Sequence, residues 1–124
     1  MRMTKLIKSV ALGAAALGIL VFAGCGSSPQ ETGEPHYKIG IVQLVEHNAL
    51  DDASRGFVDG LKTRGFEEGK NVAIDRQNAQ ADQSNLQNIV QRFISDKVNL
   101  ICAIATPSVQ SAANATKEIP IVGT

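Results

Sequence analysis

The chain has 124 residues, of which 44% are hydrophobic and 19% charged, a composition that suits one small folded domain and argues against a disordered chain. Twelve basic and twelve acidic residues give a formal net charge of zero, which excludes the strongly basic surface of a nucleic-acid-binding protein. Two cysteines are too few for the disulfide framework of a small secreted domain.

Residues 1–24 have the three-part pattern of a secretory signal peptide. Arg2, Lys5 and Lys8 make the start basic, residues 10–22 carry no charge, and the small residues Ala23 and Gly24 follow. The alternative is a transmembrane anchor, but the apolar run is shorter than the roughly 20 residues that span a bilayer. We therefore expect the first 24 residues to direct export.

The end of this segment is more specific. Phe22-Ala23-Gly24-Cys25 resembles the lipobox of bacterial lipoproteins, in which the cysteine is lipidated and becomes the new N-terminus. Phe22 departs from the family, which usually has Leu there, and the alternative is an incidental thiol near an ordinary cleavage site. The resemblance implies a lipid anchor on Cys25 at the extracytoplasmic face of the cell membrane. Residues 25–36, rich in Gly, Ser and Pro, are then a flexible tether.

Residues 37–124 alternate between strand and helix patterns. Apolar, β-branched runs predict strands at 37–45, 71–77, 100–105 and 119–122. Apolar residues at steps of three and four predict helices at 49–64, 82–97 and 106–116. This β-α-β-α-β-α-β order predicts an α/β fold with a doubly wound parallel sheet and helices on both faces.

Finer features of this pattern give further expectations. The strand at 71–77 is polar enough for a sheet edge, whereas Cys102 lies in an apolar run and is expected to be a buried small hydrophobe. We expect Asn48 and Thr106 to be helix N-caps. The four-residue spacing of two glycines predicts close packing of the first helix against a strand, at Gly56 and Gly60.

In a doubly wound sheet, ligands bind at the carboxyl ends of the strands. Glu46 and His47 follow the first strand, and Thr106 follows the third, where it either caps a helix or both caps it and contacts a ligand. The free N–H groups of Ser108 and Val109, at the start of that helix, are expected to bind an anionic group.

Several alternatives for this edge fail on the residues. Glu46, His47, Asp51 and Asp52 suggest a metal site, but Glu46 and His47 are adjacent at a strand end and point to opposite sides. We therefore expect these residues to line a ligand site or to cap and solvate the helix rather than bind a metal. The sequence has no dinucleotide fingerprint, no P-loop and no nucleophile elbow. We therefore expect neither a cofactor nor an enzymatic activity.

Residues 38–124 resemble the N-terminal lobe of an ABC-transporter substrate-binding protein, in the branch associated with tryptophan or other aromatic amino acids. The matching motifs lie in five places along the chain: Gly40-Ile41-Val42-Gln43 with Glu46-His47, Glu68-Gly69-Lys70-Asn71-Val72, Asn78-Ala79-Gln80 with Asp82-Gln83-Ser84-Asn85-Leu86, Ala105-Thr106-Pro107, and Ile119-Pro120-Ile121-Val122. The resemblance implies the fold of a type I periplasmic binding protein, in which two Rossmann-like lobes close on a ligand. It also implies that Glu46, His47, Thr106 and Pro107 line the cleft. Such proteins are much longer, so we expect this chain to be an incomplete lobe.

Together these features predict a lipid-anchored solute receptor that delivers a small ligand, such as an amino acid, to an ABC permease. A sensor subunit of the same fold, a fragment of a lipid-anchored α/β hydrolase and an unstable relic are the alternatives.

Overall fold

The computed structural model describes residues 35–124. The expected signal peptide (1–24), Cys25 and most of the tether lie outside the described residues. Seven elements follow in order: β1 (Tyr37–Gln43), α1 (Asn48–Thr63), β2 (Val72–Asn78), α2 (Gln83–Ser95), β3 (Leu100–Ile104), α3 (Thr106–Ala115) and β4 (Ile121–Gly123). Every element expected in this region is confirmed in type and order, with bounds that differ by at most two residues.

The four strands form one parallel sheet in the order β2-β1-β3-β4. β2 is an edge strand, as its polar sequence predicted, and β4 is the other edge. β3 lies inside the sheet, and Ile101 to Ile104 are all buried. The doubly wound parallel sheet predicted from the alternating pattern is therefore confirmed.

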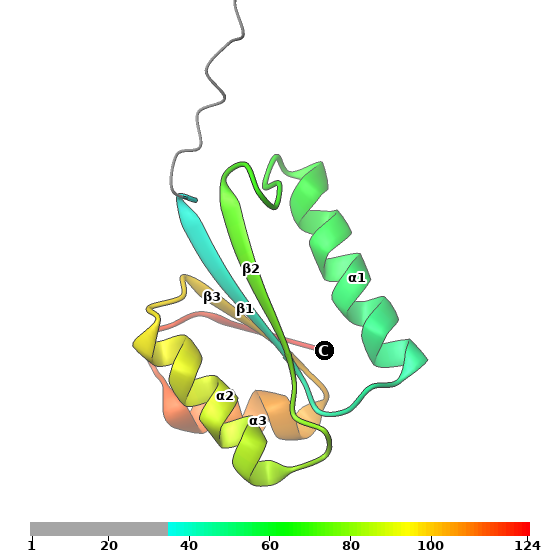
Figure 1. Ribbon diagram of the computed structural model, residues 1–124, viewed down its shortest axis with the longest axis vertical. Helices are drawn as coiled ribbons and strands as arrows, with labels where there is room; N and C mark the ends of the chain where they lie inside the picture. The colour runs from blue at the N-terminus through cyan, green and yellow to red at the C-terminus, as the bar shows by residue number, and fades with distance from the viewer. Residues whose placement is uncertain (1–34) are drawn as a thin grey trace, which may run out of the picture. The chain divides into compact units, whose positions relative to one another are not determined.

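Helices cover both faces of the sheet, with α1 on one side and α2 and α3 on the other (Figure 1). Alternate residues of β1 and β3 point to opposite faces of the sheet and belong to two separate hydrophobic cores. Ile41 and Ile104 belong to the core under α1, while Val42 and Ile101 belong to the core under α2 and α3. The second core is better filled, because Leu86, Val90 and Phe93 of α2 are completely buried.

The core under α1 is more open, since no residue of α1 is buried. Leu50, Phe57 and Leu61 pack against the sheet as its apolar stripe predicted. The predicted close packing at Gly56 and Gly60 is wrong: both are exposed, and a Cβ atom at either position would meet nothing within 4 Å.

Cys102 is 1% exposed, and burial raises the pKa of its thiol to about 11. The thiol is therefore protonated at neutral pH and behaves as the small buried hydrophobe that the sequence predicted. Within residues 35–124, no helix is long and apolar enough to cross a membrane.

Candidate ligand-binding site

The carboxyl edge of the sheet has a topological switch point between β1 and β3. The two strands are paired in parallel, with Gln43 opposite Ile104 at their ends. From there the chain leaves β1 toward α1 on one face and leaves β3 toward α3 on the other (Figure 1). A crevice at such a point is where open α/β sheets bind ligands. The fold thus brings the loop with Glu46 and His47 beside the loop with Thr106.

His47 begins α1 as its N-cap. Its backbone is extended, its Nδ1 atom accepts the N–H of Ala49 at 3.2 Å, and its carbonyl accepts the N–H groups of Leu50 and Asp51 at 2.9 Å. The predicted cap at Asn48 is wrong by one residue, because Asn48 already lies in the helix. Because Nδ1 accepts this bond, Nε2 is the ring nitrogen left to donate to a ligand.

Glu46 precedes this cap and is exposed. Its carboxylate makes no hydrogen bond or ion pair with any described residue. It therefore stands at the edge as an acceptor open to solvent or to a ligand.

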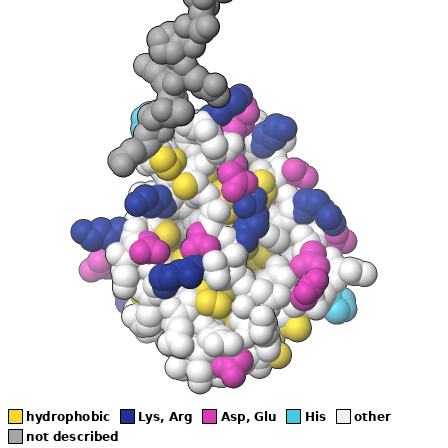
Figure 2. Space-filling view, in the orientation of Figure 1, with side chains coloured by type: hydrophobic (Ala, Val, Ile, Leu, Met, Phe, Trp, Pro, Cys, Tyr) yellow, Lys and Arg dark blue, Asp and Glu magenta, His cyan; other side chains and the backbone are white. Residues whose placement is uncertain are grey.

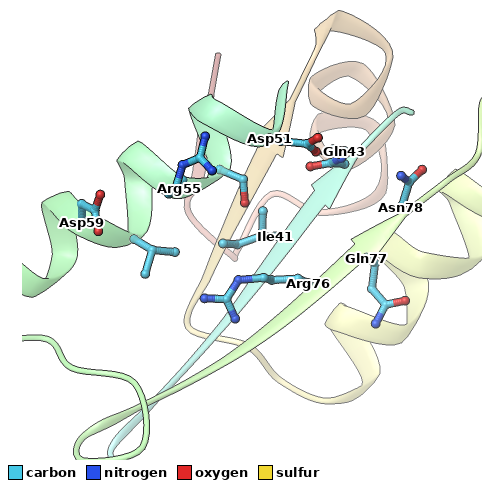
Figure 3. A pocket seen from close by; sticks show the side chains of 10 residues that line it. Ile41, Gln43, Asp51, Arg55, Asp59, Arg76, Gln77 and Asn78 are labelled. Carbon is cyan, nitrogen blue, oxygen red and sulfur yellow. Dashed lines mark hydrogen bonds between the residues drawn. The ribbon is translucent and has the colours of Figure 1, made fainter. Parts of the chain in front are cut away.

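Gln43, the last residue of β1, shapes this edge, which was not predicted from the sequence. Its Nε2 atom donates to Oδ1 of Asp51 at 2.8 Å and to the carbonyl of Val45 at 3.2 Å. Figure 3 shows the Gln43 and Asp51 side chains meeting at the carboxyl end of β1. These bonds fix the β1–α1 loop to the strand, and an amide at the end of an apolar strand was the signal available in the sequence.

α3 begins differently from the prediction. Ala105 occupies the N-cap position with φ 79° and ψ 149°, Thr106 is already helical, and no side chain caps the helix. The prediction that Thr106 is the N-cap is therefore wrong. The N–H groups of Ser108 and Val109 donate to the carbonyl of Ala105 at 3.0 and 3.2 Å, so they are not free as predicted.

The hydrogen-bond donors that remain available in this turn belong to Thr106. It is exposed, and neither its backbone N–H nor its hydroxyl bonds to another described residue. Pro107 follows within the first turn, is half-buried and has no N–H to offer. An anionic group at this helix start would meet the N–H and the hydroxyl of one residue, Thr106.

Backbone strain is concentrated at this edge. Four non-glycine residues of the described chain have positive φ, and three of them, Gln80, Ala81 and Ala105, follow β2 or β3. The loop after β2 is fastened to β1 by bonds from the N–H groups of Ala79 and Ala81 to the carbonyls of Gln43 and Leu44 (2.9 and 2.8 Å). Such conformations cost about 1–3 kcal/mol each and cluster at ligand sites.

Ser108 adds an unexplained polar atom beneath the same turn. Its side chain is completely buried, and its Oγ atom has no hydrogen-bond partner, the one such buried side-chain atom among residues 35–124. A buried hydroxyl without a partner is unfavourable by about 1–3 kcal/mol, so its presence calls for an explanation. The sequence analysis named Ser108 for its backbone N–H group and not for its hydroxyl, because a Ser side chain is ordinary in the first turn of a helix.

Next to this edge, a groove of about 390 Å³ that is lined by charged residues lies between α1 and the β1–β2 side of the sheet (Figure 3). Gln43 and Asn78 line its end nearest the carboxyl edge, and Arg55, Asp59 and Arg76 line the rest. Arg76 is held by two 2.8 Å bonds to Glu68, and these hydrogen bonds keep the pKa of the Glu68 carboxyl below its usual value. In the part of the chain that the structure describes, no three His, Cys, Asp or Glu residues gather as a metal site would require.

Comparison with known proteins identifies the class. Residues 38–124 match the family model of ABC transporter substrate binding proteins, and the chain belongs to that family. It is 44% identical over 120 residues to a tyrosine-binding protein of Clostridioides difficile, a match that covers 90% of this chain and 35% of that protein.

Solved structures agree with this assignment. A substrate-binding protein with adhesive properties from Clostridium difficile, in its ligand-free open form, superposes with a TM-score of 0.68 and is 56% identical, over 70% of this chain and 30% of that one. An ABC domain from Streptococcus pneumonia in complex with L-Trp gives a TM-score of 0.68 and 35% identity, over 71% and 30% of the two chains. The chain thus spans about a third of the length of these relatives.

Proposed function

We propose that this chain supplies one wall of the binding site of an extracytoplasmic receptor that captures an aromatic amino acid for an ABC permease. The switch point between β1 and β3 is the observation that carries the proposal. The loops that leave these two paired strands contain Glu46, His47 and Thr106, and the backbone is strained beside Thr106, at Ala105. The tyrosine-binding and L-Trp-bound relatives indicate the ligand class.

The roles follow from the groups that are free at this edge. The N–H and hydroxyl of Thr106 would bind the ligand carboxylate, and Pro107 would offer an apolar surface beside them. His47 would donate from Nε2, and the exposed carboxylate of Glu46 would accept from the ligand ammonium group. The exposed, unpartnered state of Thr106 and Glu46 supports these roles.

We also propose that Cys25 carries the lipid anchor and that residues 25–36 tether the domain to the extracytoplasmic face of the membrane. The basic start, the uncharged run at 10–22 and the lipobox-like Phe22-Ala23-Gly24-Cys25 support this proposal. Lipidation of Cys25 would leave Cys102 as the one thiol among residues 25–124.

Substituting Thr106 tests the proposed ligand site. Thr106→Val keeps the shape of the side chain and removes its hydroxyl. If the hydroxyl binds the carboxylate, affinity should fall by about 1.5–3 kcal/mol, which is roughly tenfold to a hundredfold. Calorimetric titration of the purified receptor, with both walls of the site present, with L-tyrosine and L-tryptophan measures this change.

Two controls make the result specific. Thr106→Ser retains the hydroxyl and should bind nearly as the unmodified protein does. Tyramine lacks the carboxylate, so its weaker binding should be unaffected by Thr106→Val. Equal losses for tyrosine and tyramine would show that Thr106 does not bind the carboxylate.

A further inference from the structure

The loop between β2 and α2 has an unusual backbone. Gln80 and Ala81, with φ values of 54° and 58°, are the one consecutive pair of non-glycine residues with positive φ among residues 35–124. Residues with a side chain rarely adopt this left-handed conformation, and those that do are mostly single Asn or Asp residues. Two in succession are unfavourable, so contacts with the surrounding structure hold this loop in its conformation.

These contacts join the loop to the end of β1. Ala79 is completely buried, and the N–H of Ala81 donates to the carbonyl of Leu44 at 2.8 Å. The N–H of Gln80 donates to Oδ1 of Asn78 at 2.7 Å, so the residue at the tip of the loop is also held. The β2–α2 loop is therefore fixed directly beside the β1–α1 loop, at the carboxyl edge of the sheet.

The two loops present an amide and an apolar surface at this edge. The side chain of Gln80 is exposed and makes no hydrogen bond with any described residue. Ala81 is exposed as well, and Val45 of the neighbouring loop is 36% exposed, one of three large hydrophobic residues exposed within residues 35–124. In Figure 2 hydrophobic side chains reach the surface at the lower right, the region in which Figure 1 shows the loops after β1 and β2. This combination suits a flat apolar ring that carries one polar group.

We propose that Gln80 is a specificity-determining residue that recognises the polar group on the aromatic ring of the ligand, an inference that rests on the proposed function. Its Oε1 atom accepts from the phenol O–H of tyrosine or the indole N–H of tryptophan, while the ring lies on Val45 and Ala81. Both ligand groups are neutral donors, so one amide oxygen serves both rings. The ring of phenylalanine carries no such donor.

The order of the strands supports this orientation of the ligand. β1 lies between β2 and β3, so the ends of the two outer strands are about 10 Å apart, twice the spacing of neighbouring strands. Thr106 follows β3 and would bind the carboxylate, Glu46 follows β1 and would bind the ammonium group, and Gln80 follows β2. The carboxylate and the polar ring group lie at opposite ends of tyrosine and tryptophan. A ligand held by its carboxylate at Thr106 would therefore extend its ring across the β1–α1 loop toward Gln80.

The ratio of the affinities for L-tyrosine and L-phenylalanine tests the inference, because these ligands differ by the phenol hydroxyl alone. Calorimetric titration of the purified receptor, with both walls of the site present, should show tighter binding of tyrosine. Gln80→Met keeps the length of the side chain and removes the amide. It should lower the tyrosine-to-phenylalanine ratio by about three- to tenfold and leave the affinity for phenylalanine unchanged. Gln80→Glu keeps an oxygen acceptor and should retain most of the ratio.

Two further variants make the result specific. Thr106→Val should weaken tyrosine and phenylalanine equally and leave the ratio unchanged, since both ligands have the carboxylate. Gln91→Met removes an exposed amide in the third turn of α2, away from this edge, and should change neither affinity. A receptor that binds tyrosine but has the same ratio with Gln80→Met, or has no preference over phenylalanine, would overturn this inference and leave the proposed function standing. No binding of tyrosine, tryptophan or phenylalanine by the unmodified receptor would overturn both.

Discussion

The ring of Phe93 on α2 lies directly against Gly40 of β1: a Cβ atom at position 40 would lie 2.5 Å from the ring Cδ2 atom. Phe93 is completely buried, and Gly40 is buried beneath it. Because Gly40 has no side chain, there is room for Phe93, the largest residue of the α2–α3 core, to pack against β1. This contact fixes the distance between α2 and the centre of the sheet.

Gly40→Ala should therefore destabilise the protein. The added methyl group overlaps a buried aromatic ring that cannot move without disturbing the core, so we expect a loss of about 1–3 kcal/mol in the free energy of unfolding. Chemical denaturation followed by circular dichroism measures it.

Gly56→Ala is the matched control, because the same methyl group there enters open space in the exposed part of α1. Replacing a helical glycine by alanine should raise the free energy of unfolding by about 0.5–1 kcal/mol. Destabilisation at both positions would mean that Phe93 is not the reason for the effect at Gly40.

These glycines also show what the sequence could and could not predict. Hydrophobic periodicity was sufficient for all seven elements and for the edge position of β2, because burial of apolar side chains decides both. It failed on which glycine is packed against a neighbour, since that depends on where a helix crosses the sheet. Gly56 and Gly60 had the suggestive spacing, but the close approach is at Gly40, on a strand.

For the candidate site, too, some features were predictable from the sequence and others were not. The topology placed Glu46, His47 and Thr106 at one edge, as the alternating pattern predicted. The helix starts were displaced by one residue, from Asn48 to His47 and from Thr106 to Ala105. Ala105 could not be predicted as a cap, because its positive φ is imposed by the surrounding structure and contradicts the preference of alanine.

Ser108→Ala tests whether the buried hydroxyl has a structural partner. If it has none, its removal should leave the free energy of unfolding unchanged or raise it by up to about 1 kcal/mol, because an unpaired buried group is lost and Ala favours the helix. Thermal melting of the variant and the unmodified protein gives the sign. A loss above about 1 kcal/mol would reveal a hydrogen bond to Ser108, such as one to an ordered water.

Cys25→Ala tests the proposed lipid anchor. If Phe22-Ala23-Gly24-Cys25 acts as a lipobox, the variant should accumulate as an unprocessed precursor without lipid. Labelling with a radioactive fatty acid in a bacterial host measures the lipid, and electrophoretic mobility measures processing. Cys102→Ala is the control, since the other cysteine is buried in β3 and should not affect labelling. Equal label on the Cys25→Ala variant and the unmodified chain would contradict the anchor.

His47 has one established contact and one proposed contact, and two substitutions can separate them. The established contact is the N-cap of α1, in which Nδ1 accepts the N–H of Ala49. His47→Ala removes this acceptor and should lower the free energy of unfolding by about 1 kcal/mol, whereas His47→Asn supplies another good cap and should retain most of that stability.

The proposed contact is donation from Nε2 to a bound aromatic amino acid, and the shorter Asn side chain does not extend as far from the backbone. If His47 contacts the ligand, both variants should bind L-tyrosine more weakly, and the Asn variant should do so without losing stability. Calorimetric titration and denaturation of the same two preparations measure both quantities, and normal binding by His47→Asn would restrict His47 to the helix cap.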